Sequence, residues 1–324
     1  MTLRLPVQKN TRSMSIVFWG LALLPLFFLL AMFLCFGVDV PYLDQWEFVP
    51  LLQKSYEGQL SFADFWAQHN EHRLIFPRII MLALARWTHW DIRAELTVNF
   101  LLGICLFSVA VYQIRKSLRS WNVGEDRGFF LLLSLLLFSL SQWQNWFLGW
   151  QLQVFLSLLC VITAIFVLAQ SPPRTESMIT AMALGIVGTY SFANGMLVWP
   201  IGLLMLTMTA SAWDAPVRRA LCAWIGAGTI TVASYFYAYH TPAYHPPLSV
   251  VFQHPVDFPL YVLRYLGQPM VNFHGGMAAV AGAIGLILWC FLLWGFRHQW
   301  SLLAPYFGLG LYSVISALVT GAAR

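Results

Sequence analysis

Long apolar stretches alternate with short polar ones along most of the chain. A helix needs roughly 20 consecutive apolar residues to cross the hydrocarbon core of a bilayer. About nine stretches approach this length, and they lie at residues 16–36, 95–113, 128–145, 151–170, 178–193, 195–211, 220–239, 276–296 and 301–320. The pattern predicts an all-α fold, a polytopic transmembrane helical bundle that forms a single membrane domain over residues 1–324.

The two ends of the chain each carry a further expectation. A basic N-terminal segment precedes the first apolar run, as it does in a signal peptide, but this run is longer than a signal core. We therefore expect it to remain as the first span. The last four residues, GAAR, directly follow an apolar run without a polar tail, so we expect the polypeptide to be C-terminally incomplete.

The first long loop, residues 37–94, carries helical signals of its own. Leu74–Trp90 is apolar, with Arg78 and Arg86 eight residues apart on roughly one face, a pattern typical of a helix lying in the membrane interface. Residues 50–67 predict a second helix, interrupted at Gly58 and restarted at Ser61 by an N-cap. The loop therefore predicts interfacial helices.

A second outer region, residues 239–275, is rich in prolines and aromatic residues. Its second half, residues 259–273, predicts another interfacial or re-entrant helix. If this helix crossed the membrane, every later segment would change sides. The region also contains four histidines: His240, His245, His254 and His274.

The composition supports a membrane protein and sets its expected orientation. The chain has 324 residues, of which 59% are hydrophobic and 10% charged, less than half the charge of an ordinary soluble domain. Cytoplasmic loops collect Lys and Arg. With a cytoplasmic N-terminus the inner loops would hold 11 basic residues and the outer ones seven, five of them in the long first loop. The net charge of +5 thus reflects orientation, and no basic run is dense enough to predict nucleic-acid binding.

The few acidic residues are concentrated in one part of the chain. Of 13 Asp and Glu residues, eight lie between residues 37 and 95, so chemistry is expected there. These eight are Asp39, Asp44, Glu47, Glu57, Asp64, Glu71, Asp91 and Glu95.

Asp44 lies about eight residues after the first span, between Tyr42 and Trp46. A carboxylate just outside the membrane suits a general base that deprotonates an acceptor hydroxyl or amine. Asp39 and Glu47 are the neighbouring candidates. The structural alternative is that these acids solvate a loop or cap a helix.

The run His69, Asn70, Glu71, His72 and Arg73 puts five polar residues together beside an apolar segment, which is costly unless they bind something polar. Guanidinium groups match phosphate oxygens, so Arg73 and the nearby Arg78 are candidate phosphate ligands. The two histidines, three residues apart, could instead bind a divalent metal ion on one helical face, although no third ligand is evident. Ordinary headgroup anchoring would also explain the arginines.

A third group combines tryptophans with amides at the turns between later apolar segments. Trp143 and Gln144 lie near Trp146 and Trp150, and Asn194 closes the next turn. Interfacial tryptophans usually form an aromatic belt. Indole faces beside amides also hold sugars or isoprenoid chains, so these residues are candidate substrate contacts. No nucleotide-binding motif is evident in the cytoplasmic loops.

The layout of residues 16–210, and the motif PYLDQW…FADFWAQHNEHRLIFPR within residues 39–78, resembles the GT-C superfamily. These are polytopic glycosyltransferases that use polyprenyl-phosphate-linked sugars, among them the protein O-mannosyltransferase and aminoarabinose transferase groups. A similar run occurs in uncharacterised bacterial membrane proteins grouped with them. The chain differs in having Gln45 after Asp44, where the family frequently has two adjacent acids, and in having fewer spans and no soluble C-terminal part.

The resemblance implies that Asp44 is the base and that Arg73 or Arg78 contacts the donor phosphate. The expected function is transfer of a sugar from a polyprenyl-phosphate carrier to a lipid, glycan or protein acceptor, on the outer face of a bacterial inner membrane and among membrane lipids. The alternatives are a transporter or flippase of a lipid-linked or anionic substrate, and a surface-polysaccharide polymerase or ligase. Transporters place ionisable groups near the midplane, whereas these spans are nearly free of charge.

Overall fold

The computed structural model describes residues 12–122, 128–170, 174–210, 213–242, 245–247, 249–253, 255–271 and 274–323. Within this part of the chain almost every regular element is a helix, which confirms the predicted all-α class. The only strands described are β1 (Gln68–His69) and β2 (His72–Arg73), which form a small antiparallel hairpin. His254 and residues 272–273 of the second outer region lie outside the described residues.

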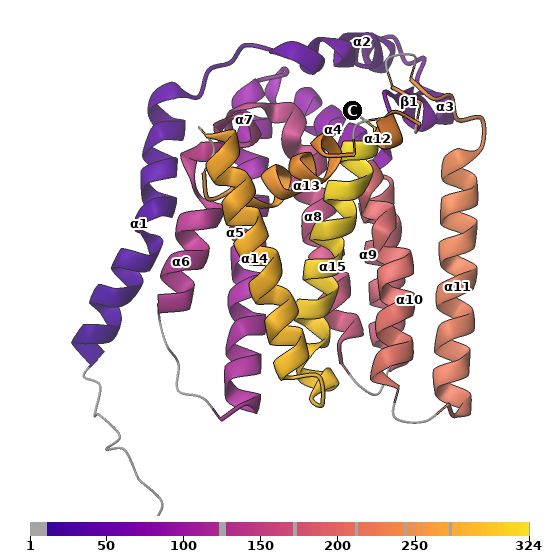
Figure 1. Ribbon diagram of the computed structural model, residues 1–324. Helices are drawn as coiled ribbons and strands as arrows, with labels where there is room; N and C mark the ends of the chain where they lie inside the picture. Colours follow the sequence, from indigo (N-terminus) through magenta and orange to yellow (C-terminus); the bar gives the residue numbers. More distant parts are fainter. Residues whose placement is uncertain are drawn as a thin grey trace, which may run out of the picture.

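Most of the molecule is a set of helices that stand side by side (Figure 1). They are α1 (Arg12–Phe36), α5 (Ile92–Ser120), α6 (Gly128–Leu137), α8 (Leu152–Leu168), α9 (Thr175–Thr189), α10 (Val198–Thr209), α11 (Ala215–Phe236), α14 (Gly275–Gly295) and α15 (Trp300–Ala322). Five stretches in the described chain are long and apolar enough to cross a membrane: Phe18–Phe36, Ile92–Ser120, Gly149–Leu168, Gly275–Gly295 and Trp300–Ala322.

The predicted span at residues 128–145 is not one helix. The helix α6 ends at Leu137, and three short helices follow: η2 (Leu140–Gln142), α7 (Trp143–Phe147) and η3 (Gly149–Gln151). Ser139 accepts a hydrogen bond from the Ser141 amide at 3.0 Å, and Gln142 donates to the Leu137 carbonyl at 2.6 Å. These polar side chains satisfy main-chain groups locally, which competes with continuation of the helix.

The hydrophobic core between α8, α9, α10, α11 and α15 is organised by two indoles in contact, tilted 46° to each other. The rings of Trp199 and Trp224 lie 4.7 Å apart, and the Trp224 indole donates to the Trp199 carbonyl at 2.9 Å. The Trp199 indole in turn donates to Thr189 at 3.1 Å. Both indole N–H groups are therefore satisfied inside an apolar core, which fixes α9, α10 and α11 against one another.

The loop after α1 folds into a layer of short helices over one end of the bundle (Figure 1). Its elements are η1 (Leu43–Phe48), α2 (Val49–Tyr56), α3 (Phe62–Trp66), the β1–β2 hairpin and α4 (Ile75–Thr88). The predicted break at Gly58 and the restart at Ser61 are confirmed, because Gly58 has φ of 69° and Ser61 forms a capping box with Asp64. The helix predicted over Leu74–Trp90 is also present, as α4.

This layer is held onto the bundle by its own apolar core. Phe48 and Leu51, from η1 and α2, pack with Met81 of α4 against Trp150 and Leu152 at the start of α8. The first outer loop is therefore a packed layer with a fixed position over η3 and α8.

The second outer region lies at the same end of the molecule, as α12 (Val250–Gln253) and α13 (Asp257–Gly267) (Figure 1). The helix predicted at residues 259–273 is therefore present but spans only 11 residues. It packs closely along α14. A Cβ on Gly267 would lie 1.9 Å from the Ala278 carbonyl oxygen, and one on Gly282 would lie 1.9 Å from that of Leu263. Only glycine permits this approach.

Candidate functional site

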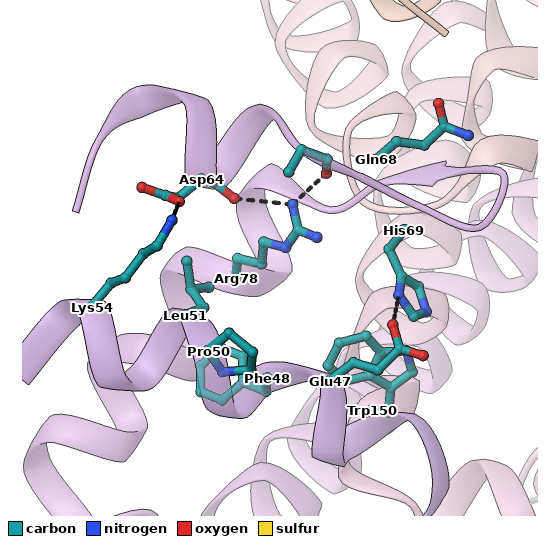
Figure 2. A pocket seen from close by; sticks show the side chains of 11 residues that line it. Glu47, Phe48, Pro50, Leu51, Lys54, Asp64, Gln68, His69, Arg78 and Trp150 are labelled. Carbon is teal, nitrogen blue, oxygen red and sulfur yellow. Dashed lines mark hydrogen bonds and ion pairs between the residues drawn. The ribbon is translucent and has the colours of Figure 1, made fainter. Parts of the chain in front are cut away.

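A cavity of about 250 Å³ lies within the layer formed by the loop after α1, between η1, α2, the α3–β1 segment and α4 (Figure 2). It combines two carboxylates, two cations and a histidine over an apolar floor. Its lining residues are Glu47, Phe48, Pro50, Leu51, Lys54, Asp64, Ala67, Gln68, His69, Arg78 and Trp150. Three of the residues singled out in the sequence, Glu47, His69 and Arg78, thus lie around one space.

His69 lies between two of the predicted catalytic carboxylates. Its Nδ1 is 2.9 Å from Glu47 Oε2, and its Nε2 is 3.9 Å from Asp44 Oδ2. The Asn70 amide lies 3.3 Å from the same Nε2, and the ring meets Trp150 edge-on at 5.0 Å. The short contact to Glu47 favours a proton on Nδ1, which leaves Nε2 able to accept one. The imidazole is 4% exposed, whereas the side chains of Glu47 and Asp44 are 61% and 51% exposed.

Arg78 uses one side of its guanidinium to hold α3 in place. Its Nη1 donates to the main-chain carbonyls of Asp64, Phe65 and Ala67, where α3 ends. Figure 2 shows the bonds to Asp64 and Ala67 on one side of the group and its opposite side facing the space toward His69. Burial lowers the pKa of Arg78, and the carboxylates of Asp64 and Glu47 act in the opposite direction, so the group remains a cation.

Asp64 and Lys54 form an ion pair at the edge of the cavity. The hydrogen bond from Lys54, together with those from the Ser61 hydroxyl and amide, lowers the pKa of Asp64 to about 2. Asp64 is therefore ionised at any physiological pH, and Lys54 is already neutralised by it. Arg78, the other cation of this cavity, donates its hydrogen bonds among the described residues to uncharged main-chain carbonyls.

The short helix that carries Asp44 and Glu47 is anchored from below by a buried pair that the sequence reasoning missed. Gln45 donates to Glu95 Oε2 at 2.9 Å, and its own amide oxygen accepts from the Tyr42 main chain at 3.1 Å. Both Gln45 and Glu95 are buried. A Cβ on Gly149 would lie 2.3 Å from Glu95 Oε2, so Gly149 leaves room for the pair. Glu95 could have been recognised from the sequence because it is an acidic residue in the first turn of a long apolar segment.

Arg73 and Asp39 both make structural contacts. Arg73 is 2% exposed and donates from all three guanidinium nitrogens to the main-chain carbonyls of Trp66, Tyr235 and Tyr237. It thereby ties the hairpin to the end of α11, and burial lowers its pKa. Asp39 accepts from the Ile92 amide at 2.8 Å, at the N-terminus of α5. The role of Arg73 as a phosphate ligand and that of Asp39 as a candidate general base stay predictions.

The turn and second strand of the hairpin contact the α9–α10 connection and the second outer region. His72 accepts from the Ala193 amide at 3.2 Å and stacks on Phe192 at 4.2 Å. The two carboxylate oxygens of Glu71 lie 3.6 Å from His72 and 3.6 Å from His245.

The sequence His69–His72 is a hairpin and not the helix on which the metal prediction depended. His69 and His72 are Cα partners across the two strands, with Asn70 at the turn in a left-handed conformation of φ 49°. Among the described residues, no group of three or more His, Cys, Asp or Glu side chains is arranged to hold a metal ion.

The remaining predicted contacts lie apart from this cavity. Trp143 and Gln144 are exposed on α7, whereas Trp150, from the same segment, forms the floor beneath His69. Asn194 lies in η4 (Ala193–Leu197) and lines a second cavity, described below. Lys54, Asp64 and Gln68 line the charged cavity without having been predicted as site residues.

Comparisons of this chain with protein-family models, with curated proteins and with solved structures find no match.

Proposed function

We propose that this protein is an integral-membrane glycosyltransferase that moves a sugar from a polyprenyl-phosphate carrier to a lipid, glycan or protein acceptor. The observation that carries the proposal is the charged cavity beside long apolar helices. There a guanidinium, an imidazole and carboxylates lie where the phosphate of a membrane-embedded lipid would arrive.

Arg78 binds the donor phosphate in this proposal. A polyprenyl-phosphate sugar carries one negative charge, and its leaving group, polyprenyl phosphate, carries a second. A cation fixed by three carbonyls at the cavity wall stabilises that developing charge without having to reorganise. The apolar residues around it, Phe48, Leu51 and Trp150, suit the first isoprene units.

The group Asp44, His69 and Glu47 accepts the proton from the acceptor. The acceptor oxygen forms a bond to the anomeric carbon of the sugar, while the bond from that carbon to the phosphate oxygen breaks. The hydroxyl proton passes to His69 Nε2, with Glu47 on Nδ1 and Asp44 close to Nε2 to stabilise the resulting imidazolium. Gln45 and Glu95 are positioning residues because they fix the helix that carries both carboxylates.

We place this chemistry on the outer face of a bacterial inner membrane, with about nine crossings and a cytoplasmic N-terminus. The helices α6, α9, α10 and α11 supplement the five long ones and run alongside them. The test is a cysteine introduced at the exposed Glu57, in a chain without its five native cysteines, and treated with a membrane-impermeant maleimide. Labelling of intact spheroplasts is expected, and labelling only after lysis would reverse the orientation.

The functional experiment measures polyprenyl phosphate released by purified protein in nanodiscs from a panel of polyprenyl-phosphate sugars, each with an acceptor mixture of membrane lipids. This product is common to every donor of the class. Wild type is expected to release it, and His69→Gln, which removes the proton acceptor, to lose about 10²–10⁴-fold of the rate, as is usual for a general base. Glu47→Gln and Asp44→Asn remove the carboxylates that stabilise the imidazolium and are expected to lose part of that rate. Glu57→Gln, an exposed acid of the same loop, is the matched control.

The results separate the function from its alternative. Release that is unaffected by His69→Gln and by both carboxylate variants would remove the proposed base. If wild type bound the donors but released no polyprenyl phosphate, the result would instead support the alternative function, a transporter or flippase. In that case the same cations would hold a phosphate without breaking a bond.

A further inference from the structure

A second cavity, of about 190 Å³, lies within the helices and not in the charged layer. It is bounded by α8, η4, α13 and α15, which meet near the end of the bundle covered by the first outer loop (Figure 1). Its lining residues are Val154, Ser157, Leu158, Phe192, Asn194, Tyr265, Tyr312, Ser313 and Ser316. None of them is charged, but six carry a hydroxyl or an amide.

The inner end of this cavity is polar and closed to solvent. Ser157 and Ser316 are 1% and 4% exposed, and Ser316 Oγ makes no hydrogen bond of standard geometry among the described residues, with the Tyr312 hydroxyl as a polar neighbour. Ser157 donates to the Gly188 carbonyl at 3.0 Å, which leaves its oxygen able to accept. Asn194 makes one described contact, a long one of 3.5 Å to Thr320. A buried polar atom without a partner costs free energy unless a ligand or water satisfies it.

The outer end is aromatic and open. Tyr265 and Ser313 are exposed at the mouth, and Phe192 forms one wall. The Phe192 ring is also stacked on His72, the residue paired with His69 across the two strands. The second cavity and the charged cavity therefore both lie next to the same hairpin.

We propose that this second cavity is a binding site for one uncharged, hydroxylated ring, such as the sugar of a glycolipid. Aromatic walls with a few converging hydroxyls and an amide provide apolar contact to the ring faces and hydrogen bonds to its hydroxyls. At about 30 Å³ per water, the cavity has the volume of roughly six waters, which is the space of one small polyol or sugar ring. An anion is disfavoured because no lining residue carries a charge.

The experiment uses the whole protein in nanodiscs that contain no glycoside detergent. The probe is octyl glucoside below its micellar concentration, and the comparison ligand is octyl tetraethylene glycol, which has the same alkyl chain without a sugar ring. Saturation-transfer NMR measures contact between the protein and the protons of the glucose ring. Wild type is expected to saturate the ring protons of the glucoside and to bind the comparison ligand at least about tenfold more weakly.

Variants place the binding in the cavity. Ser316→Leu fills its closed end and Asn194→Leu removes its amide, and each is expected to weaken glucoside binding about tenfold. Ser316→Ala keeps the space but removes the hydroxyl, so it tests the hydrogen bond if the larger residue prevents folding. Ser108→Leu, at an exposed position on α5, is the matched control and is expected to bind like wild type.

Three results would overturn the proposal. Equal binding of the two octyl ligands would show a nonspecific apolar crevice. Absent glucoside binding would show a cavity that holds only water, and glucoside binding that is unchanged in all three folded cavity variants would show a site elsewhere on the protein. The site does not depend on the phosphate chemistry, and Arg78→Gln is therefore expected to leave glucoside binding unchanged. Each of the two proposals can thus fail alone.

Discussion

The two strands of the β1–β2 hairpin each contribute a histidine, and the two histidines have different surroundings. In β2, Arg73 and the ring nitrogen of His72 are occupied by main-chain groups of α11 and of the segment that begins η4. In β1, His69 meets exposed carboxylates, and the nearby Arg78 presents one side of its guanidinium to a cavity. The comparison teaches that a polar run in an apolar chain can divide its work, one strand fixing the fold and the other facing a ligand.

Replacing Arg73 by Met should have the largest effect on stability. The change removes the bonds to three carbonyls, of Trp66, Tyr235 and Tyr237, and leaves buried acceptors unsatisfied. We expect a loss on the order of 3 kcal/mol or more of unfolding free energy, measured by denaturant titration in detergent. Arg86→Met, on the exposed side of α4, is the control. If both variants lost equally little unfolding free energy, Arg73 would not be the anchor of this strand.

Gly149→Ala should disturb the support beneath Asp44 and Glu47. The new Cβ would overlap Glu95 Oε2 and lie 2.6 Å from the Gln45 amide nitrogen. We expect destabilisation of about 1–3 kcal/mol from this overpacking, with faster amide hydrogen exchange in residues 43–48. Gly226→Ala, in the interior of α11 with no atom within 4 Å of its Cβ position, should instead be neutral or slightly stabilising. If the two variants had the same stability and the same hydrogen exchange, the proposed support of Asp44 and Glu47 by the Gln45–Glu95 pair would be contradicted.

Arg78→Gln should weaken binding of polyprenyl phosphate about tenfold, which corresponds to about 1.4 kcal/mol. The glutamine can still donate to the α3 carbonyls but carries no charge, so the fold should remain. Native mass spectrometry of nanodisc-extracted protein measures the bound fraction. Arg86→Gln, which removes the same charge about two turns further along α4 and outside the cavity lining, should bind like wild type. A similar loss in both variants would indicate only general attraction of anionic lipid.

Asp64→Asn should have the smallest effect, and its pH dependence has a defined sign. Folding lowers the pKa of Asp64 from 3.8 to about 2, so its ionised form stabilises the folded protein. That contribution is fully present above the unfolded pKa and is lost as the pH falls from about 4 to about 2. The midpoints of thermal unfolding of wild type and variant should therefore differ by a constant amount at higher pH and converge below about pH 4. A constant difference down to pH 2 would place the stabilisation elsewhere.

Much of the fold followed from local patterns. The restart of the first loop at Ser61 and the helix at Ile75–Thr88 were predictable because capping and amphipathic spacing act within a few residues. The break of residues 128–145 was not, because apolar content alone does not reveal that Ser139 and Gln142 satisfy main-chain groups and end α6.

The candidate site was predictable in composition but not in geometry. The clustering of acids pointed to the first loop, and Glu47, His69 and Arg78 do line one cavity. The hairpin at His69–His72 could not be foreseen, since the same residues fit a helical face equally well. Gln45 and Glu95 are 50 positions apart, and only the tertiary fold brings them together.

A structure of the protein in nanodiscs with polyprenyl phosphate bound would test the central claim most directly. The account predicts phosphate density within hydrogen-bonding distance of the Arg78 guanidinium, in the cavity floored by Trp150 and next to His69. Phosphate density away from this cavity, for example beside Arg115 and Arg119 at the far end of α5, would contradict it.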